Sequence, residues 1–352
     1  MCFDWGGTVM RELPGMTGPM ASWPRVEAIP GVKDALRALH GRYRLAVATN
    51  AAASDAALVR AALARVGLSA FFDTVCTARD LGAEKPDPAF FHGVLTRLNC
   101  SPAEAAMVGD GYTTDVVGAK QAGLWAIWFN PSGDPCPCVH PLHDAELRDM
   151  AALPAALSDL RLPDLNTCLE LLAEHGVPAG VVRHSLAVAA AAHHLAHRLR
   201  ERGARVDPLL AHRGGLLHDL DKVMSLQSAG VHGRIAAGIL SERGFPELAA
   251  IAERHVLGAQ DGEGRPQTWE EKLVFYADKI VEGDQVVGIE PRLAALRYRY
   301  PAYVEDLERS LPYLRALETE IAGRVGSSPE ELMAELRALD PSLSGERAAP
   351  CG

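Results

Sequence analysis

In the first 130 residues, short apolar runs alternate with stretches whose apolar residues recur every three or four positions. Three apolar runs end in polar loops and predict buried strands: residues 42–50, 105–110 and 123–130. Three stretches between them have helical spacing: residues 31–40, 54–67 and 87–98. Strands that alternate with helices favour a parallel, doubly wound α/β sheet, in which ligands bind at the carboxyl ends of the strands.

After residue 165 the pattern is helical throughout. Apolar residues recur at i, i+3 and i+4, with Gly or Pro between the segments. The predicted helices are residues 165–176, 179–203, 207–223, 232–244, 246–258, 268–283, 302–323 and 328–338. Residues 131–165 are rich in Pro and Gly and have no period, which is typical of a domain edge followed by a linker.

The chain is therefore expected to hold an α/β domain followed by an all-α domain, in keeping with about 150 residues per domain. We assign residues 1–150 to the α/β domain, 151–165 to a linker, 166–340 to the all-α domain and 341–352 to a disordered tail. Only three residues precede Asp4 in the first strand, which is short for a buried strand and suggests a natural start further upstream.

Composition narrows the class of protein. The chain is 48% hydrophobic and 23% charged, which is ordinary for a globular protein with a good core. No apolar run reaches about 18 residues, so no membrane span is expected. A net charge of −10 argues against a nucleic-acid polymer as partner. The seven cysteines are odd in number and scattered, which favours a reducing cytoplasm over a disulfide framework.

Polar side chains with a coherent chemistry follow the predicted strands of the first half. They are Asp4, Thr49, Asn50, Lys85, Asp110 and Asp115. A carboxylate nucleophile needs a nearby cation, and carboxylates hold Mg²⁺ well. A Thr hydroxyl and a Lys ammonium suit phosphoryl oxygens. Read alone, "VGDGYTTD" is also compatible with a turn of solvated carboxylates.

The stretches "FDWGGT", "VATN", "EKPDP" and "VGDGYTTDVVGAKQAG" resemble the four motifs of the haloacid dehalogenase superfamily, over residues 1 to about 160. The resemblance implies a Rossmann-like sheet and a hydrolase. It implies Asp4 as nucleophile and Lys85 as a catalytic, phosphate-binding residue, with Thr49 and Asn50 also at the phosphate. It further implies Mg²⁺ held by Asp4, Asp110 and Asp115.

One position departs from the pattern of the superfamily's phosphatases. Where they carry a second Asp that protonates the leaving group, this chain has Gly6. Loss of a general acid typically costs a factor of ~10²–10⁴. The phosphonate-cleaving members resemble this loop in having a small residue there. Both a working hydrolytic site and a degenerate, ligand-sensing one are compatible with Gly6.

The spacing of the motifs leaves little room for a cap domain. Each gap holds one helix–strand unit, and residues 10–30 are long enough only for a flap. We expect a site that is open to solvent or to a bulky substrate, or that is covered by the second domain.

The helical half carries an ordered set of metal-ligand side chains: His184, His218, Asp219, His232, His255 and Asp278. Neutral imidazole and carboxylate are ligands that transition metals accept. Singly, a His on an apolar helix face is more often a hydrogen-bonded core residue. The adjacent His218 and Asp219 point about 100° apart on a helix, so a shared metal has to lie in the notch between them.

The order H…HD…D, made by His184, His218, Asp219 and Asp278, is similar to that of the HD superfamily of metal-dependent phosphohydrolases, over about residues 166–290. The resemblance implies one or two metal ions that activate water; His232 and His255 match members with a second ion. Fe or Mn suits such a site, with Mg, Zn and Co as alternatives. Lys222 resembles the lysine of the "HDxxK" form and would stabilise phosphate charge.

Two further groups of side chains have less specific patterns. The cramped set Cys136, Cys138, His140 and His143 is interpreted as a Pro-rich surface loop rather than a zinc site. His193, His194 and His197 share one helix and are interpreted as solvated or boundary residues.

The leading hypothesis is a cytoplasmic hydrolase of small phosphorylated molecules, such as nucleotides, with one Mg²⁺ site and one His/Asp metal site. In the second hypothesis, the α/β half is a regulatory or binding module beside an active HD domain. A metabolite-sensing or scaffold protein is the third. The sequence does not define the oligomeric state.

Overall fold

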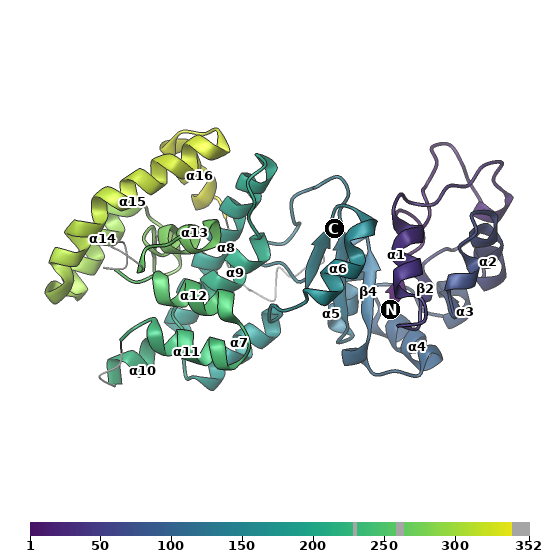
Figure 1. Cartoon of the computed structure of the whole chain (residues 1–352), viewed down its shortest axis with the longest axis horizontal. Helices are drawn as coiled ribbons and strands as arrows, with labels where there is room; N and C mark the ends of the chain where they lie inside the picture. The colour runs from purple at the N-terminus through teal and green to yellow at the C-terminus, as the bar shows by residue number, and fades with distance from the viewer. Residues whose placement is uncertain (228–230, 258–263, 340–352) are drawn as a thin grey trace. The chain divides into compact units, whose positions relative to one another are not determined.

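The computed structural model describes residues 1–227, 231–257 and 264–339. Contacts divide it into two compact units, one of residues 1–137 and 142–160, the other of residues 138–141 and 161 onward (Figure 1). We describe each unit by itself. The domain limits assigned from the sequence remain a prediction.

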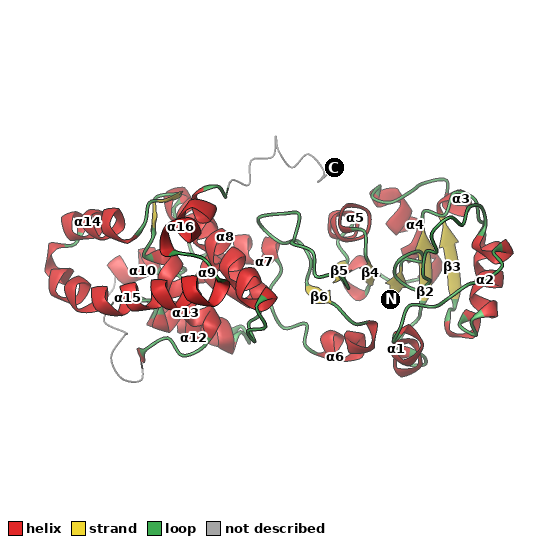
Figure 2. Cartoon of the chain, turned by 90° about the horizontal axis from the view of Figure 1, so that it is seen from above, coloured by secondary structure: helices red, strands yellow, loops and turns green. Residues whose placement is uncertain are grey.

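The N-terminal unit is built on a parallel sheet with the strand order β3-β2-β1-β4-β5-β6 (Figure 2). The strands are β1 Cys2–Phe3, β2 Ala46–Thr49, β3 Thr74–Thr77, β4 Ala106–Gly109, β5 Trp125–Phe129 and β6 Ala145–Leu147. The chain leaves β1 toward β2 on one side and returns to β4 on the other. The order therefore switches between β1 and β4, where doubly wound sheets open a crevice for ligands.

Helices accompany the sheet: α1 Val32–Leu39, α2 Ala56–Arg65, α3 Ala78–Leu81, α4 Pro88–Leu98, α5 Gly118–Gln121 and α6 Leu153–Ser158. Asp55 and Asp87 cap α2 and α4 by accepting bonds from main-chain N–H groups. The α/β prediction for this half is confirmed. Two strands, β3 and β6, and the helix α6 lie where the sequence pattern predicted no element. They have only three to six residues each, too few for a period to show.

The C-terminal unit is helical, as predicted. Its helices are α7 Leu165–Glu174, α8 Ala179–Glu201, α9 Pro208–Leu217, α10 Lys222–Gln227, α11 Arg234–Glu242, α12 Pro246–Arg254, α13 Trp269–Asp278, α14 Ile289–Arg299, α15 Val304–Val325 and α16 Pro329–Arg337. A two-stranded antiparallel hairpin, β7 Val281–Glu282 and β8 Gln285–Val286, follows α13.

Two predicted helices of this unit are shorter than expected. The helix predicted for residues 207–223 ends at Leu217, and a turn over residues 218–221 separates it from α10. His218 and Asp219 therefore lie in a turn rather than on a continuous helix. The helix predicted for residues 268–283 ends at Asp278, before the hairpin turn at Gly283, whose φ is 60°.

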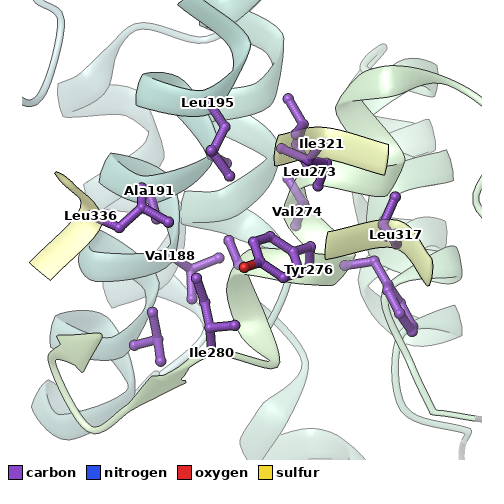
Figure 3. Packing of buried hydrophobic residues seen from close by; sticks show 14 of the residues in the cluster. Val188, Ala191, Leu195, Leu273, Val274, Tyr276, Ile280, Leu317, Ile321 and Leu336 are labelled. Atoms are coloured by element: carbon purple, nitrogen blue, oxygen red, sulfur yellow. The ribbon is translucent and has the colours of Figure 1, made fainter. Parts of the chain in front are cut away.

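The core of the C-terminal unit is formed chiefly by α8, α13 and α15. Figure 3 shows Val188 and Leu195 of α8 facing Leu273 of α13 and Ile321 of α15. All four side chains are fully buried. Small residues such as Ala191 line α8, which lets neighbouring helices approach it closely.

The N-terminal unit has a separate core, formed where one face of its sheet packs against α1 and α2. Phe3, Val47, Val108 and Ile127 of the central strands are fully buried, as expected for parallel strands covered by helices. Across both units, the described helices include none with the length and hydropathy of a membrane span.

Candidate active sites

The first site lies at the carboxyl edge of the parallel sheet. Asp4 directly follows β1, Thr49 ends β2, and Asp110 directly follows β4. Asp115 lies in η4, a π-helical turn over Tyr112–Val117. Because β1 and β4 are neighbours, the structure brings Asp4, Asp110 and Asp115 together, with one carboxylate oxygen of each within 4.8 Å of the others.

Lys85 is the cation of this site. Its buried ammonium donates to Asp4 Oδ1 at 2.5 Å and to Asp115 Oδ1 at 2.5 Å. Burial alone would lower the pKa of Lys85, but the two carboxylates raise it, so the side chain is charged. Burial raises the pKa of Asp115 to about 7, an effect that Lys85 opposes. The lysine therefore opposes the protonation of Asp115 that burial favours.

Asp110 is held by the loop after β1. Thr8 Oγ1 donates to Asp110 Oδ1 at 2.7 Å and accepts from the Asp110 main-chain N–H at 3.0 Å. The main chain of Gly7, with a φ of 77°, packs so closely on the Asp110 carboxyl that a Cβ has no space there. The second glycine of "FDWGGT" is thus explained by a left-handed turn and close packing.

Asn50 lies at the site, and its side chain is bonded to the protein itself. Both polar atoms of its amide bind the main chain of Lys85: Nδ2 donates to the carbonyl at 2.8 Å and Oδ1 accepts from the N–H at 2.8 Å. The side chain positions the lysine, and a contact of Asn50 with phosphate remains a prediction. Thr49 Oγ1 accepts from Ala51 N–H at 3.2 Å, which leaves its hydroxyl proton available to a ligand.

These side chains line a pocket of about 430 Å³. Its wall also contains Glu12, Gly18, Met20 and Trp23 of the segment between β1 and α1. The only regular element of that segment is the short 3-10 helix η1, Met20–Ser22. Three carboxylates around one point fit a hard, oxygen-seeking cation such as Mg²⁺, and Lys85 supplies positive charge beside them.

The second site lies in the C-terminal unit and gathers six side chains from five segments. His184 comes from α8, His218 and Asp219 from the turn after α9, His232 from the turn before α11, His255 from the end of α12 and Asp278 from the end of α13. Three overlapping groups of these side chains have ligand atoms within 4.8 Å of one another: His184–His218–Asp219, His218–His255–Asp278 and Asp219–His232–His255.

The imidazoles of this cluster share one orientation. Nδ1 of His184 donates to Gly283 O at 3.0 Å, that of His218 to Gly215 O at 2.7 Å, and that of His255 to Ala252 O at 2.6 Å. A carbonyl only accepts, so each ring carries a proton on Nδ1 and turns Nε2 toward the centre, where Nε2 of His184 lies 3.0 Å from Asp278 Oδ1. Among the residues that the structure describes, the buried His218 Nε2 has no hydrogen-bond partner. A metal ion is the ligand that this orientation suits.

The two carboxylates of the cluster are ionised. Burial raises the pKa of Asp219, but the Lys222 ammonium and a hydrogen bond from His232 lower it well below its usual range. Asp278 behaves alike, because Lys279, His184 and Arg292 outweigh burial. Lys222 Nζ lies 3.3 Å from Asp219 Oδ2. Burial lowers the pKa of His218 to about 3, which keeps that ring neutral as a ligand must be.

Three charged residues around this cluster were missed in the sequence. Asp221 accepts from His232 Nδ1 at 2.7 Å and from the N–H groups of Gly233 and Ala236. Lys279 donates to Asp278 Oδ2 and to His255 O, and Arg292 donates to Asp278 Oδ1 at 3.1 Å. "HDLDK" and "ADK" place Asp221 and Lys279 beside motif residues, but no spacing rule pointed to Arg292.

The remaining candidate side chains are arranged differently from the prediction. His140 and His143 are buried, so the interpretation as a surface loop is wrong for both. His143 Nδ1 lies 3.2 Å from Tyr112 Oη, and Cys136 Sγ bonds the same hydroxyl at 3.3 Å. His140 Nδ1 instead lies 2.9 Å from His212 Nε2, in the C-terminal unit.

His193 and His197 are also buried, which contradicts the interpretation of these two as solvated or boundary residues. The reason is that α9, α13 and α15 pack on successive faces of α8, which leaves that helix little exposed surface. His193 contacts the ring of His212, with centroids 5.8 Å apart. His194 is half-buried and lies 3.3 Å from Glu335.

The fold and the two clusters define the arrangement of the chain: an α/β domain with a carboxylate–lysine site precedes a helical domain with a His/Asp cluster. Comparison with protein families agrees. Residues 18–123 match the haloacid dehalogenase-like hydrolases, and residues 181–282 match the HD domain. The chain belongs to both families, one in each half.

Relatives of known sequence include three archaeal proteins. The uncharacterized protein MJ0778 of Methanocaldococcus jannaschii is 40% identical over 31% of this chain and 71% of its own length. A glyceraldehyde 3-phosphate phosphatase of Methanothermobacter thermautotrophicus is 41% identical over 19% of this chain and 30% of its own. A ribulose-1,5-bisphosphate 5-phosphatase of Halopiger xanaduensis is 35% identical over 30% and 43%. The chain thus spans less than half of the two phosphatases.

Proposed function

We propose that this protein hydrolyses small phosphorylated molecules, nucleotides among them, at two separate metal-dependent sites. The α/β site would use Asp4 as nucleophile, with Thr49 and Lys85 at the phosphoryl oxygens and Mg²⁺ held by Asp4, Asp110 and Asp115. The helical site would hold one or two ions such as Fe or Mn. Its ligands would be His184, His218, Asp219, His232, His255 and Asp278, with Lys222 facing the phosphate.

One observation carries the proposal: the imidazoles of the helical cluster are fixed through Nδ1 and turn Nε2 toward two ionised carboxylates. Buried imidazole nitrogens and carboxylates that face one another are unfavourable unless a proton or a cation lies between them. A bound cation of this kind supplies an acidified water and neutralises phosphoryl charge. The phosphatases among the relatives support small phosphate esters as the substrate class.

Gly6 supports a second candidate function for the α/β half. Without the second Asp of the superfamily's phosphatases, that half would bind a phosphorylated ligand and regulate the HD domain rather than turn the ligand over. The two candidates differ in what Asp4 does, because only the first requires it as a nucleophile.

The experiment is a phosphatase and phosphodiesterase screen of three proteins after metal analysis: the wild type, Asp4→Ala and His218→Ala/Asp219→Ala. If both sites are catalytic, each variant loses a different activity. The His218→Ala/Asp219→Ala protein, the HD variant, also loses bound transition metal. If Asp4→Ala keeps every activity and the HD variant loses all, the regulatory candidate replaces the first. Unchanged turnover in both variants would reject both candidates.

A further inference from the structure

The space beside Gly6 is already filled. A Cβ built on Gly6 would lie 2.5 Å from Glu12 Oε1 and 3.3 Å from its Cδ. Gly6 does not have a positive φ, in contrast to Gly7, so its backbone does not need glycine. The carboxyl group of Glu12 therefore stands at the place that a side chain of residue 6 would occupy.

The fold of the loop explains how a residue so far along the chain reaches this place. Met10 N donates to Trp5 O at 2.8 Å, Gly7 N donates to Met10 O at 2.9 Å, and Gly6 forms a bridge with Met10. This tight turn brings Met10 back beside Gly6, with the two segments parallel. Glu12, two positions past the turn, is thereby returned to Gly6 on the pocket wall.

Glu12 differs from every other ionisable side chain of the pocket. The others are Asp4, Lys85, Asp110 and Asp115, and each is engaged: Lys85 with two carboxylates, and Asp110 with Thr8. Among the described residues, none forms a hydrogen bond or an ion pair with the Glu12 carboxyl, which is exposed to solvent. Among the described acids of the pocket wall, it is the one whose carboxyl group is not engaged by another side chain.

We propose that Glu12 is the general acid and base of the α/β site, in place of the acid that position 6 lacks; this rests on the proposed hydrolysis at Asp4. Asp4 attacks phosphorus, the bond to the leaving oxygen breaks, and that oxygen takes the proton of the Glu12 carboxyl group. The Glu12 carboxylate then takes a proton from a water that attacks the aspartyl phosphate. The Asp4–phosphorus bond breaks, which releases phosphate and restores both carboxyl groups.

The test compares Glu12→Gln with Asp4→Asn and with Glu27→Gln. Glu27 is a matched control: it lies on the same segment but pairs with Arg11 and Arg25 and does not line the pocket. The probes are 4-nitrophenyl phosphate, whose leaving group needs little protonation, and glycerol 1-phosphate, whose leaving group needs it fully.

If Glu12 is the acid, Glu12→Gln lowers kcat/KM for glycerol 1-phosphate by ~10²–10⁴ and for 4-nitrophenyl phosphate by much less. Because the second step also loses its base, acid-quenched Glu12→Gln carries phosphate on the peptide of Asp4, detected by mass spectrometry. Glu27→Gln behaves as the wild type. A merely structural Glu12 would affect both probes alike and leave no trapped phosphoenzyme.

A rescue variant separates a chemical role from a steric one. Glu12→Ala vacates the space beside Gly6, and Gly6→Asp in that background places a carboxyl group there from the other chain position. The double variant should recover glycerol 1-phosphate hydrolysis relative to Glu12→Ala alone.

The outcomes distinguish the two levels of the proposal. If Asp4→Asn abolishes turnover and Glu12→Gln does not change it, Glu12 is rejected while the hydrolytic site stands. If Asp4→Asn changes nothing, or if the wild type hydrolyses neither probe, the hydrolytic site itself is rejected and Glu12 with it.

Discussion

At the scale of single residues, the α/β site depends on one buried ammonium among three acids. Lys85 lies within 2.5 Å of both Asp4 and Asp115, and its charge opposes the upward pKa shift that burial imposes on Asp115. A site of this kind is sensitive to loss of the cation, because the carboxylates then repel one another with little solvent between them.

We expect Lys85→Met to lower phosphomonoester turnover at the α/β site by on the order of 10²–10³, since a fixed positive charge at the phosphoryl group is lost. Steady-state kinetics with 4-nitrophenyl phosphate measures it. Lys120→Met is the control, because Lys120 pairs with Asp144 away from the pocket and should retain activity. Equal rates for the two variants would contradict the role of Lys85.

Asp221 shows how a residue that is no ligand can matter to a metal. It holds Nδ1 of His232, and its other oxygen is fixed by two main-chain N–H groups. We expect Asp221→Asn to weaken the affinity for one bound ion by ~10–100-fold, because the partner that orients His232 loses its charge. Competition with a chelator measures this affinity.

The matched control is Asp306→Asn, which removes a carboxylate from an exposed pair with Arg309 on α15. Its metal affinity should equal that of the wild type. An Asp221→Asn protein that binds both ions as tightly as this control would show that His232 needs no orientation by Asp221.

At the scale of elements, the long periodic helices and the central strands were predictable, and the interruptions were not. Residues 179–203 were expected to be a helix and α8 spans Ala179–Glu201. The break after Leu217 was missed, because "GGLLHDLDK" keeps an apolar spacing across it. The strands β3 and β6 were missed because a run of three or four residues carries too little pattern.

The residues of the two candidate sites also divide into those that the sequence predicted and those that it did not. Asp4 and Asp110 were visible because a carboxylate directly after a short apolar run is a recognisable local pattern. Glu12 and Arg292 were not, because what makes them relevant is contact with residues brought close by a turn or by another helix. Asn50 was assigned to phosphate from its place in the motif, whereas its amide bonds are with the Lys85 main chain.

The helix that delivers Asp278 begins with a capping box. Thr268 accepts from Glu271 N–H, while the Glu271 carboxylate accepts from Thr268 N–H. We expect Thr268→Ala to lower the free energy of unfolding by about 1 kcal/mol without changing metal content, since Asp278 lies at the far end of α13. Chemical denaturation and metal analysis measure the two effects.

Ser328→Ala is the comparison, because Ser328 caps α16 by the same motif at a helix that carries no ligand. The free energy of unfolding should fall by a similar amount in both variants. Loss of metal from Thr268→Ala alone would mean that the start of α13 is coupled to the site.

At the scale of the whole molecule, the chain has two hydrophobic cores rather than one. One gathers around β1 and β2, and the other around α8 and α13. Metal ligands of the two candidate sites are likewise confined to one unit each. A substitution in one core should therefore lower the free energy of unfolding of that unit and leave the other unit unchanged.

We expect calorimetry to resolve two unfolding transitions. Metal bound at the HD site should raise the midpoint temperature of one of them. Leu195→Ala, in α8, should lower that transition, and Leu63→Ala, in α2, should lower the other, each by about 2–5 kcal/mol in free energy of unfolding because both side chains are fully buried. A single transition that both variants lower equally would show that the units unfold together.

The carbonyl anchors of His184, His218 and His255 bear on how the cation is exchanged. Because main-chain carbonyls hold these rings, the metal site is formed before an ion binds. The polypeptide does not have to fold around the ion. A chelator should then remove the metal ion while circular dichroism at 222 nm stays constant. Metal that is added back should bind again without a delay for refolding.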